Sequence, residues 1–133
     1  MKEPITIINK IELNSATISL RNDRIILYSI KDNITISAKD SNEMVEAAGK
    51  LGNFQKFPVL IVGGKHTLAD KEAREFGAGQ EGTKYALAVA FVLKSLAQKI
   101  LGNAYIKINK PIVPTRLFDN EEKAIEWLKT FLK

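Results

Sequence analysis

The sequence contains no cysteine, one histidine and few aromatic residues, and each shortage excludes a class of chemistry. Without cysteine the chain has no disulfide framework, no thiolate metal ligand and no thiol nucleophile. Because His66 stands alone, sites with several histidine ligands and triads with a histidine base are disfavoured, so we expect neither a metal nor a cofactor. Aromatic residues make up 8% of the chain and are not interleaved with the basic residues, so nucleic-acid binding is not expected either.

Long apolar runs are also missing. Ile5–Ile8, which follows the polar start Met1–Pro4, is far too short for a signal peptide or a membrane span. The chain of 133 residues is 45% hydrophobic and 26% charged, and these are ordinary values for a globular domain with a buried core. We therefore expect one domain over residues 1–133, located in the cytoplasm and without a membrane-spanning segment.

Acidic residues are absent between Glu81 and Asp119, although the net charge of the whole chain is only +5. Four basic residues of this interval form a candidate basic surface, namely Lys99, Lys107, Lys110 and Arg116. A surface of one charge sign suits an acidic or phosphate-bearing partner. The alternative is an ordinary solvated face of a slightly basic protein.

The hydrophobic pattern predicts an α/β fold that begins with antiparallel strands. Ile5–Leu13, Ala16–Leu20 and Arg24–Ile30 are short strands separated by polar turns. The continuous apolar runs Pro58–Val62 and Tyr85–Phe91 are typical of inner strands that are buried on both faces. The expected order is β-β-β-α-β-α-β-α-β-α, a mixed sheet carrying about four helices.

Capping residues and apolar periodicity predict the helices. The predicted elements of the helical part are a helix over Ile36–Leu51, a short helix from Thr67 to about Phe76, a helix over Leu93–Ile108, a strand over Thr115–Phe118 and a helix over Asn120–Leu132. Thr35 or Ser37 would cap the first of these, although Ile34–Ala38 also alternates as a strand would. Asp119 is the predicted N-cap of the last helix. Gly77–Gly82 matches G-x-G-x-x-G but follows a helix, so it is predicted to be a loop and not a nucleotide site.

A recognisable order of motifs lies near the C-terminus. Leu101–Pro111 ends in Asn-Lys-Pro, Pro114–Phe118 contains Arg-Leu-Phe, and Asp119–Leu128 places an acidic cap before Ala-x-x-Trp-Leu; Lys71–Phe76 is a second match. In this order the chain resembles the small bacterial proteins described as STAS/SEC14-like, or SpoIIAA-like after the anti-sigma-factor antagonist. The resemblance implies a SpoIIAA-like mixed sheet and a non-enzymatic regulatory or protein-interaction module.

Gly63–Thr67 is the candidate binding site, and it consists of Gly63, Gly64, Lys65, His66 and Thr67. It follows a buried strand and precedes a predicted helix N-terminus, where backbone amides and the helix dipole attract an anion. The resemblance implies a phosphorylated serine or threonine at this place, which here is Thr67, although the usual Asp-Ser-Ser-Gly-like motif is absent. The alternative is a glycine turn in which Thr67 only caps the helix.

Three function classes stay open at this point. The first is the regulatory or protein-interaction module, and the second is a small-ligand or lipid binder with an apolar pocket beneath the helix over Leu93–Ile108. That helix carries an apolar stripe from Leu96 to Ile108, which either lines a pocket or packs solidly on the sheet. A hydrolase or transferase is disfavoured because no base, nucleophile and orienting group occur together. The isoleucine-rich first strand is a candidate sheet edge, so a homodimer is expected.

Overall fold

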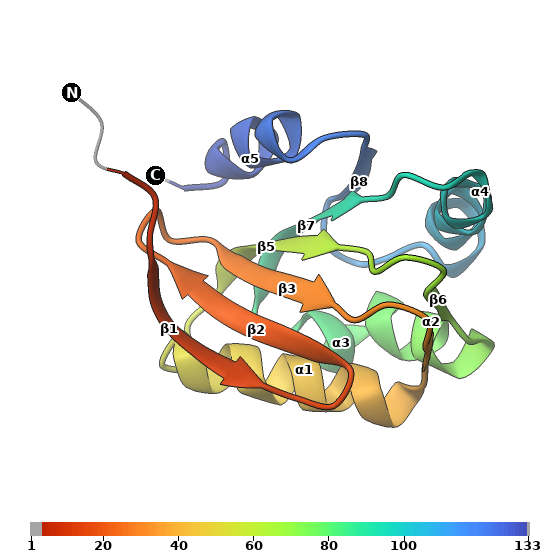
Figure 1. The fold of residues 1–133 in the computed structure, drawn as a ribbon, viewed down its shortest axis with the longest axis horizontal. Coiled ribbons are helices and arrows are strands. Elements are labelled where there is room, and N and C mark those ends of the chain that lie inside the picture. Colours follow the sequence, from red (N-terminus) through yellow and green to blue (C-terminus); the bar gives the residue numbers. More distant parts are fainter. Residues whose placement is uncertain (1–3, 133) are drawn as a thin grey trace.

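The computed structural model describes residues 4–132, and the two ends of the expected domain, residues 1–3 and 133, lie outside the described part. A six-stranded sheet runs through its middle in the order β1-β2-β3-β5-β7-β8 (Figure 1). The strands are β1 (Ile7–Glu12), β2 (Ala16–Arg21), β3 (Ile26–Ile30), β5 (Phe57–Val62), β7 (Ala86–Val92) and β8 (Thr115–Phe118). β1, β2 and β3 pair antiparallel, whereas β3, β5, β7 and β8 pair parallel. The expected mixed sheet is confirmed.

Helices cover both faces of this sheet. The helices are α1 (Ala38–Leu51), α2 (Lys71–Ala78), α3 (Gln80–Thr83), α4 (Leu96–Ala104), the π-helix η1 (Tyr105–Asn109) and α5 (Glu121–Lys129). Figure 1 shows α1, α2 and α3 below the sheet, α5 above it, and α4 beyond the ends of β5 and β7. A separate two-stranded ladder joins β4 (Thr35–Ile36) to β6 (Leu68–Ala69).

The alternation of side chains along the inner strands creates two apolar cores. On β5, Val59 faces the core beneath α1, while Leu60 faces the core beneath α5. The first core contains Met44 and Ala48 of α1, and the second contains Leu128 of α5. Both faces of β5 and β7 are therefore buried, as their continuous apolar runs predicted.

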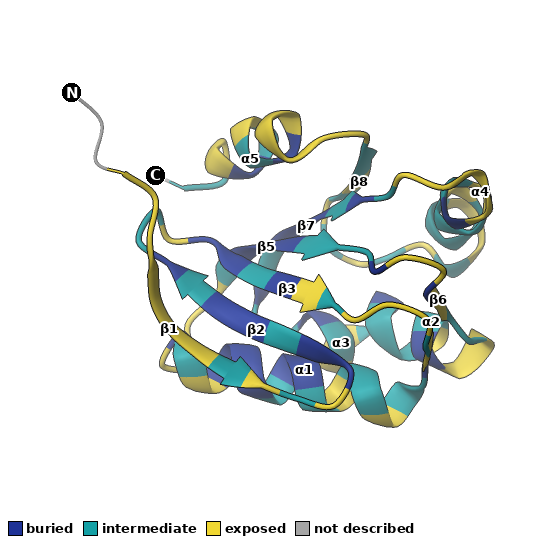
Figure 2. Ribbon diagram, viewed as in Figure 1, coloured by how far each residue is buried: buried dark blue, intermediate teal, exposed yellow. Residues whose placement is uncertain are grey.

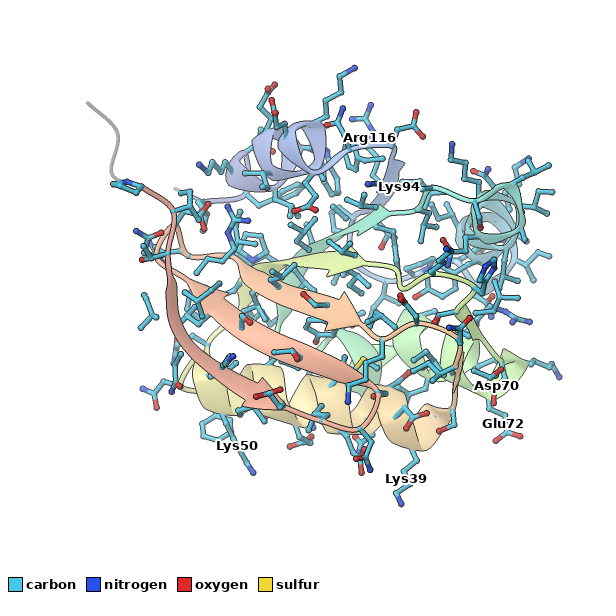
Figure 3. All side chains as sticks on the ribbon, in the orientation of Figure 1. Lys39, Lys50, Asp70, Glu72, Lys94 and Arg116 are labelled. Carbon is cyan, nitrogen blue, oxygen red and sulfur yellow. The ribbon has the colours of Figure 1, made fainter. Side chains whose placement is uncertain are left out.

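Figure 2 shows how this burial is distributed. The inner strands are largely buried, whereas β1 is mostly exposed along its length. Lys39 and Lys50 of α1 point away from the sheet, so the outer side of that helix is polar (Figure 3). Within residues 4–132 no helix is both long enough and apolar enough to span a bilayer.

Some predicted boundaries are wrong, and the structure shows why. Ser37 caps α1 in a reciprocal box with Asp40, as predicted, and the ambiguous stretch before it forms the short strand β4. Asp70, not Thr67, caps α2, and Asn120, not Asp119, caps α5. In both cases another capping residue stands close by, so the sequence alone does not distinguish the two.

Two further expectations about the helices are also wrong. The predicted loop over Gly77–Gly82 is largely helical, because α2 extends to Ala78 and α3 begins at Gln80. The predicted helix over Leu93–Ile108 begins later, after the N-cap Ser95. It then changes to the π-helix η1, and Lys110 ends it with a left-handed backbone conformation at φ 51°.

Candidate functional site

A cavity of about 190 Å³ lies between the sheet and helices α1, α2 and α4. Its wall is mostly apolar and includes Tyr28, Ile61 and Phe91 from the sheet and Met44, Phe76 and Leu101 from the helices. The cavity lies beneath the helix that follows β7, although most of the apolar stripe expected to line it is exposed.

Small residues leave this space open. Where the facing elements meet, the wall is formed by Ala69, Ala73, Gly77, Ala86 and Gly102. Their short side chains leave part of the space between sheet and helices unfilled, although a Cβ atom on Gly102 would lie 2.9 Å from Leu93 and 3.1 Å from Leu117. Protein interiors normally pack without voids of this size. This concentration of small residues on facing elements is the sequence signal that marks the cavity, and it becomes recognisable only once the elements are placed together.

Two tyrosines bring hydroxyl groups to the cavity. Tyr28 of β3 is buried, and Tyr105 begins η1. Burial raises the pKa of Tyr28 far above its usual range and raises the pKa of Tyr105 to about 12. Both hydroxyls are protonated at neutral pH, as ordinary tyrosines are, and burial keeps them so to a higher pH.

Gln98 fastens α4 over the cavity. Its side-chain amide Nε2 donates to the backbone oxygen of Gly64 at 2.7 Å and to that of Thr67 at 2.8 Å. The side chain is buried, and it joins α4 to the loop that follows β5. Gln98 does not belong to the predicted apolar stripe, so the sequence analysis missed it as a site residue.

The candidate segment Gly63–Thr67 forms that loop, and it is tied to the turn after β3. The amide of Lys65 donates to Asp32 Oδ1 at 2.7 Å, and the amide of Asn33 donates to the backbone oxygen of Lys65 at 2.7 Å. A Cβ atom on Gly64 would lie 2.1 Å from the backbone oxygen of Lys31, so only glycine permits this close approach. Lys65 and His66 are exposed at the tip of the loop.

Thr67 is buried beneath the loop, with 6% of its surface exposed. Its hydroxyl donates to the backbone oxygen of Lys31 at 2.5 Å and accepts from the amide of Ile34 at 3.3 Å. The hydroxyl group thus acts as both donor and acceptor in hydrogen bonds that join the loop to the segment after β3. Phosphorylation of Thr67 stays a prediction, and in this conformation it would require the loop to open.

The N-terminus of α2 does not lie at the candidate segment. Asp70 Oδ1 accepts a hydrogen bond from the amide of Ala73 at 2.8 Å, so a carboxylate already caps this helix. Figure 3 shows Asp70 and Glu72 at this end of α2, pointing outward. An anion at Gly63–Thr67 would therefore not meet the helix dipole on which the predicted anion site depended.

The predicted basic surface comes from three separate elements. Lys99 of α4 pairs with Asp119 at 2.9 Å, and this ammonium group lowers the pKa of the Asp119 carboxyl. On β8, the guanidinium carbon of Arg116 lies 5.3 Å from the centre of the Phe118 ring. Lys107 lies in η1 and Lys110 directly follows it, and both are exposed. Lys94 and Arg116 project to the same side of the molecule in Figure 3.

The exposed side of α4 and η1 is unexpectedly apolar. Leu96, Ile100 and Ile108 are 74%, 62% and 76% exposed, so the predicted burial of these stripe residues is wrong. The face that turns inward consists of Gln98, Leu101, Gly102 and Tyr105, which follow helical spacing equally well. The two hydrogen bonds of Gln98 decide between the two faces. Across residues 4–132 no group of three or more histidine, aspartate or glutamate side chains could hold a metal ion.

Comparison with solved structures finds an uncharacterised protein of the DUF3478 family with a SpoIIAA-like fold, from Shewanella loihica PV-4. The two chains share 15% sequence identity with a TM-score of 0.56, over 96% of this chain and 98% of that one. At this identity the likeness concerns the fold alone. The fold is SpoIIAA-like, as the resemblance of the C-terminal motifs predicted. No curated protein matches the chain.

A family model matches residues 18–132, which is nearly all of the sheet and every helix. The matched region contains the whole wall of the cavity, the loop Gly63–Thr67 and Gln98. The chain belongs to this family, whose description is Domain of unknown function (DUF7793).

Proposed function

We propose that this domain binds a small, largely apolar molecule in the cavity beneath α4. The observation that supports the proposal is the cavity itself, because interiors of folded domains are normally filled. An apolar cavity of about 150 Å³ is known to bind benzene, so a space of about 190 Å³ suits a somewhat larger molecule. Pockets for drug-sized ligands are larger, at about 300 Å³ or more.

The way in lies beneath α4. This helix contributes Leu101, Gly102 and Tyr105 to the wall, and its one buried residue is Gln98. Its outer residues contact solvent, so few apolar contacts hold it in place. The cavity is already partly open to solvent, and breaking the two hydrogen bonds of Gln98 would widen its opening.

The test measures binding of 1-octanol by isothermal titration calorimetry and by amide chemical shifts. We expect saturable binding that shifts residues of β5, β7 and α4 around the cavity. Ala73→Leu places a larger side chain into the cavity wall and should weaken binding at least about tenfold. Ala97→Leu is the matched control, because Ala97 is exposed on α4 and does not line the cavity.

Two results would contradict the proposal. One is the absence of saturable binding of 1-octanol by the folded native protein. The other is equal weakening by the two leucine variants, because binding would then not depend on the cavity. Should Ala73→Leu fail to fold, Ala86→Leu on β7 fills the same space from the sheet side.

A second candidate function, a protein-interaction module, is favoured by the exposed apolar side of α4 and η1. Leu96 and Ile100 lie one helical turn apart on this side, and exposed apolar side chains grouped on one element commonly mark a docking surface. The chain from Gly82 to Phe118 carries no acidic residue and contributes the exposed Lys107 and Lys110. The partner that fits is a protein with an apolar strip bordered by carboxylates.

An Ile100→Glu variant tests this second function. A biotinylated amphipathic helical peptide with leucines along one side and glutamates beside them serves as the probe. We expect the native protein to bind it and Ile100→Glu to lose binding, whereas Ile112→Glu, an exposed isoleucine outside α4 and η1, should retain it. Equal binding by all three proteins would contradict a docking role for this surface.

A further inference from the structure

Arg74 is the one charged residue in the wall of an otherwise apolar cavity, among the residues that the structure describes. It lies in α2, one residue after the cavity-lining Ala73, and is half-buried. A cation beside an apolar space is unfavourable unless something compensates its charge. Because the side chain is half-buried, solvent compensates part of this charge, and the rest can be compensated by a bound anion.

The nearby acidic side chains do not neutralise Arg74. Asp70 caps the helix through the amide of Ala73, and Glu75 pairs with Lys71 at 3.6 Å. Within residues 4–132 no carboxylate lies at ion-pair distance from the Arg74 guanidinium. The charge is therefore available to a group that enters from outside the protein.

The guanidinium is held in place from one side. Its Nη1 donates to the backbone oxygen of Ala69 at 2.6 Å, and Ala69 itself lines the cavity. A guanidinium has five N–H donors in a planar fork, so one such bond leaves the others for a ligand. A carboxylate matches this fork with two parallel hydrogen bonds, and such charge-assisted pairs are stronger than neutral ones.

We propose that the ligand of this cavity is a small carboxylic acid whose carboxylate binds Arg74 while its apolar part fills the cavity. The proposal rests on the proposed function, because it identifies the chemical class of the molecule bound there. The volume of about 190 Å³ suits an apolar part of roughly six to eight carbon atoms, somewhat more than benzene. Medium-chain fatty acids and small aromatic acids are the classes that fit.

The experiment compares octanoate with 1-octanol, two probes of equal chain length that differ in their charge. We expect native protein to bind octanoate at least about tenfold more tightly, since a charge-assisted hydrogen bond contributes that much or more. Arg74→Gln should remove this preference while leaving the affinity for 1-octanol within about twofold. Arg74→Lys keeps the charge but not the fork, and should retain part of the preference.

Arg116→Gln is the control, because Arg116 is an arginine on β8 that does not line the cavity. It should leave the affinities for both probes unchanged. Equal affinity of the native protein for octanoate and 1-octanol would overturn the carboxylate proposal and leave the cavity proposal standing. Failure of both probes to bind would overturn the proposed function itself. Even where an Arg74 variant does not fold, the comparison of octanoate with 1-octanol on the native protein tests whether the cavity prefers a carboxylate.

Discussion

Gln98 uses one side-chain amide to donate to two backbone carbonyl groups, those of Gly64 and Thr67. The oxygen of Gly64 also accepts from the amide of Thr67 at 3.3 Å, whereas the oxygen of Thr67 depends on Gln98, and an unpaired buried polar group costs about 1–3 kcal/mol. A single residue thereby joins two segments that are distant in the chain, namely the loop after β5 and α4.

Replacing this amide should destabilise the protein. Gln98→Met keeps a similar side-chain size but donates no hydrogen bond, so we expect the free energy of unfolding to fall by about 2 kcal/mol. Urea denaturation measures the change. Gln80→Met, on the exposed surface of α3, should change it by less than about 0.5 kcal/mol. A loss at position 98 no greater than at position 80 would show that the two hydrogen bonds do not stabilise the fold.

Tyr105 makes stability depend on alkaline pH. Its pKa is about 12 in the folded protein, against an ordinary value of about 10 in the unfolded chain. Below about pH 10 both states hold the proton, and the contribution to stability is complete. Between about pH 10 and 12 the unfolded chain loses the proton first, so stability falls as the pH rises.

The Tyr105→Phe variant isolates this contribution. Phenylalanine has no proton to lose, so the drop in unfolding free energy between pH 8 and pH 11 should be smaller in the variant than in the native protein. Thermal or urea unfolding at the two pH values measures both drops. Equal drops in the two proteins would mean that the Tyr105 hydroxyl is not kept protonated by the fold.

At the scale of single elements, α4 and η1 differ from the other helices in how they are held. α1 and α5 insert apolar side chains into the two cores, whereas α4 turns Leu96 and Ile100 to solvent and depends on Gln98 and Leu101. Amides of α4 and η1 should therefore exchange with deuterium at least about tenfold faster than those of β5 and β7. Mass spectrometry of peptides after timed labelling measures this, and equal protection would contradict a weakly held helix.

The sequence predicts these elements unevenly, and the reasons are physical. β5 and β7 were predictable because a strand buried on both faces must be apolar throughout. The inward face of α4 was not predictable, because its apolar residues are so numerous that two faces fit helical spacing, and the face that turns inward is the one that contains the polar Gln98. The π-helix η1 likewise has no local sequence signal that distinguishes it from an α-helical turn.

The candidate site was predictable only in part. The loop Gly63–Thr67 does adjoin the cavity, because a glycine-rich connection after an inner strand lies at the end of a sheet. The cavity wall itself combines residues from Tyr28 to Tyr105, and small residues along a chain carry no sign that they will face one another. Arg74 lies in the motif Lys71–Phe76, but nothing in that charged stretch indicated that this one side chain would line the cavity.

At the scale of the whole molecule, the sheet ends in two edge strands, β1 and β8, and β1 is the edge that carries exposed isoleucines. Ile5, Ile7 and Ile8 are exposed there, and no strand within residues 4–132 pairs with the outer side of β1. Such an edge tends to recruit another strand, so the expected homodimer would form by pairing of two β1 strands. Light scattering at high micromolar concentration should give the mass of a dimer.

The Ile8→Lys variant tests whether the β1 edge forms the interface of the expected homodimer. A lysine on the edge strand opposes strand pairing, so this variant should be monomeric under conditions in which the native protein is dimeric. Ile112→Lys changes an equally exposed isoleucine outside the sheet and should leave the dimer intact. A monomeric mass for the native protein would contradict the expected homodimer, and dissociation by Ile112→Lys alone would place the interface elsewhere.

The loop to which Gln98 donates its two hydrogen bonds is also a suitable position for a fluorescent label. Both hydrogen bonds end on backbone oxygens, so the identities of Lys65 and His66 do not matter to them, and these two side chains are exposed. Because the chain has no cysteine, Lys65→Cys introduces a unique thiol at the loop tip. A fluorophore attached there would lie on the loop to which Gln98 bonds, so a change in its emission when a ligand is added would report a change at the cavity.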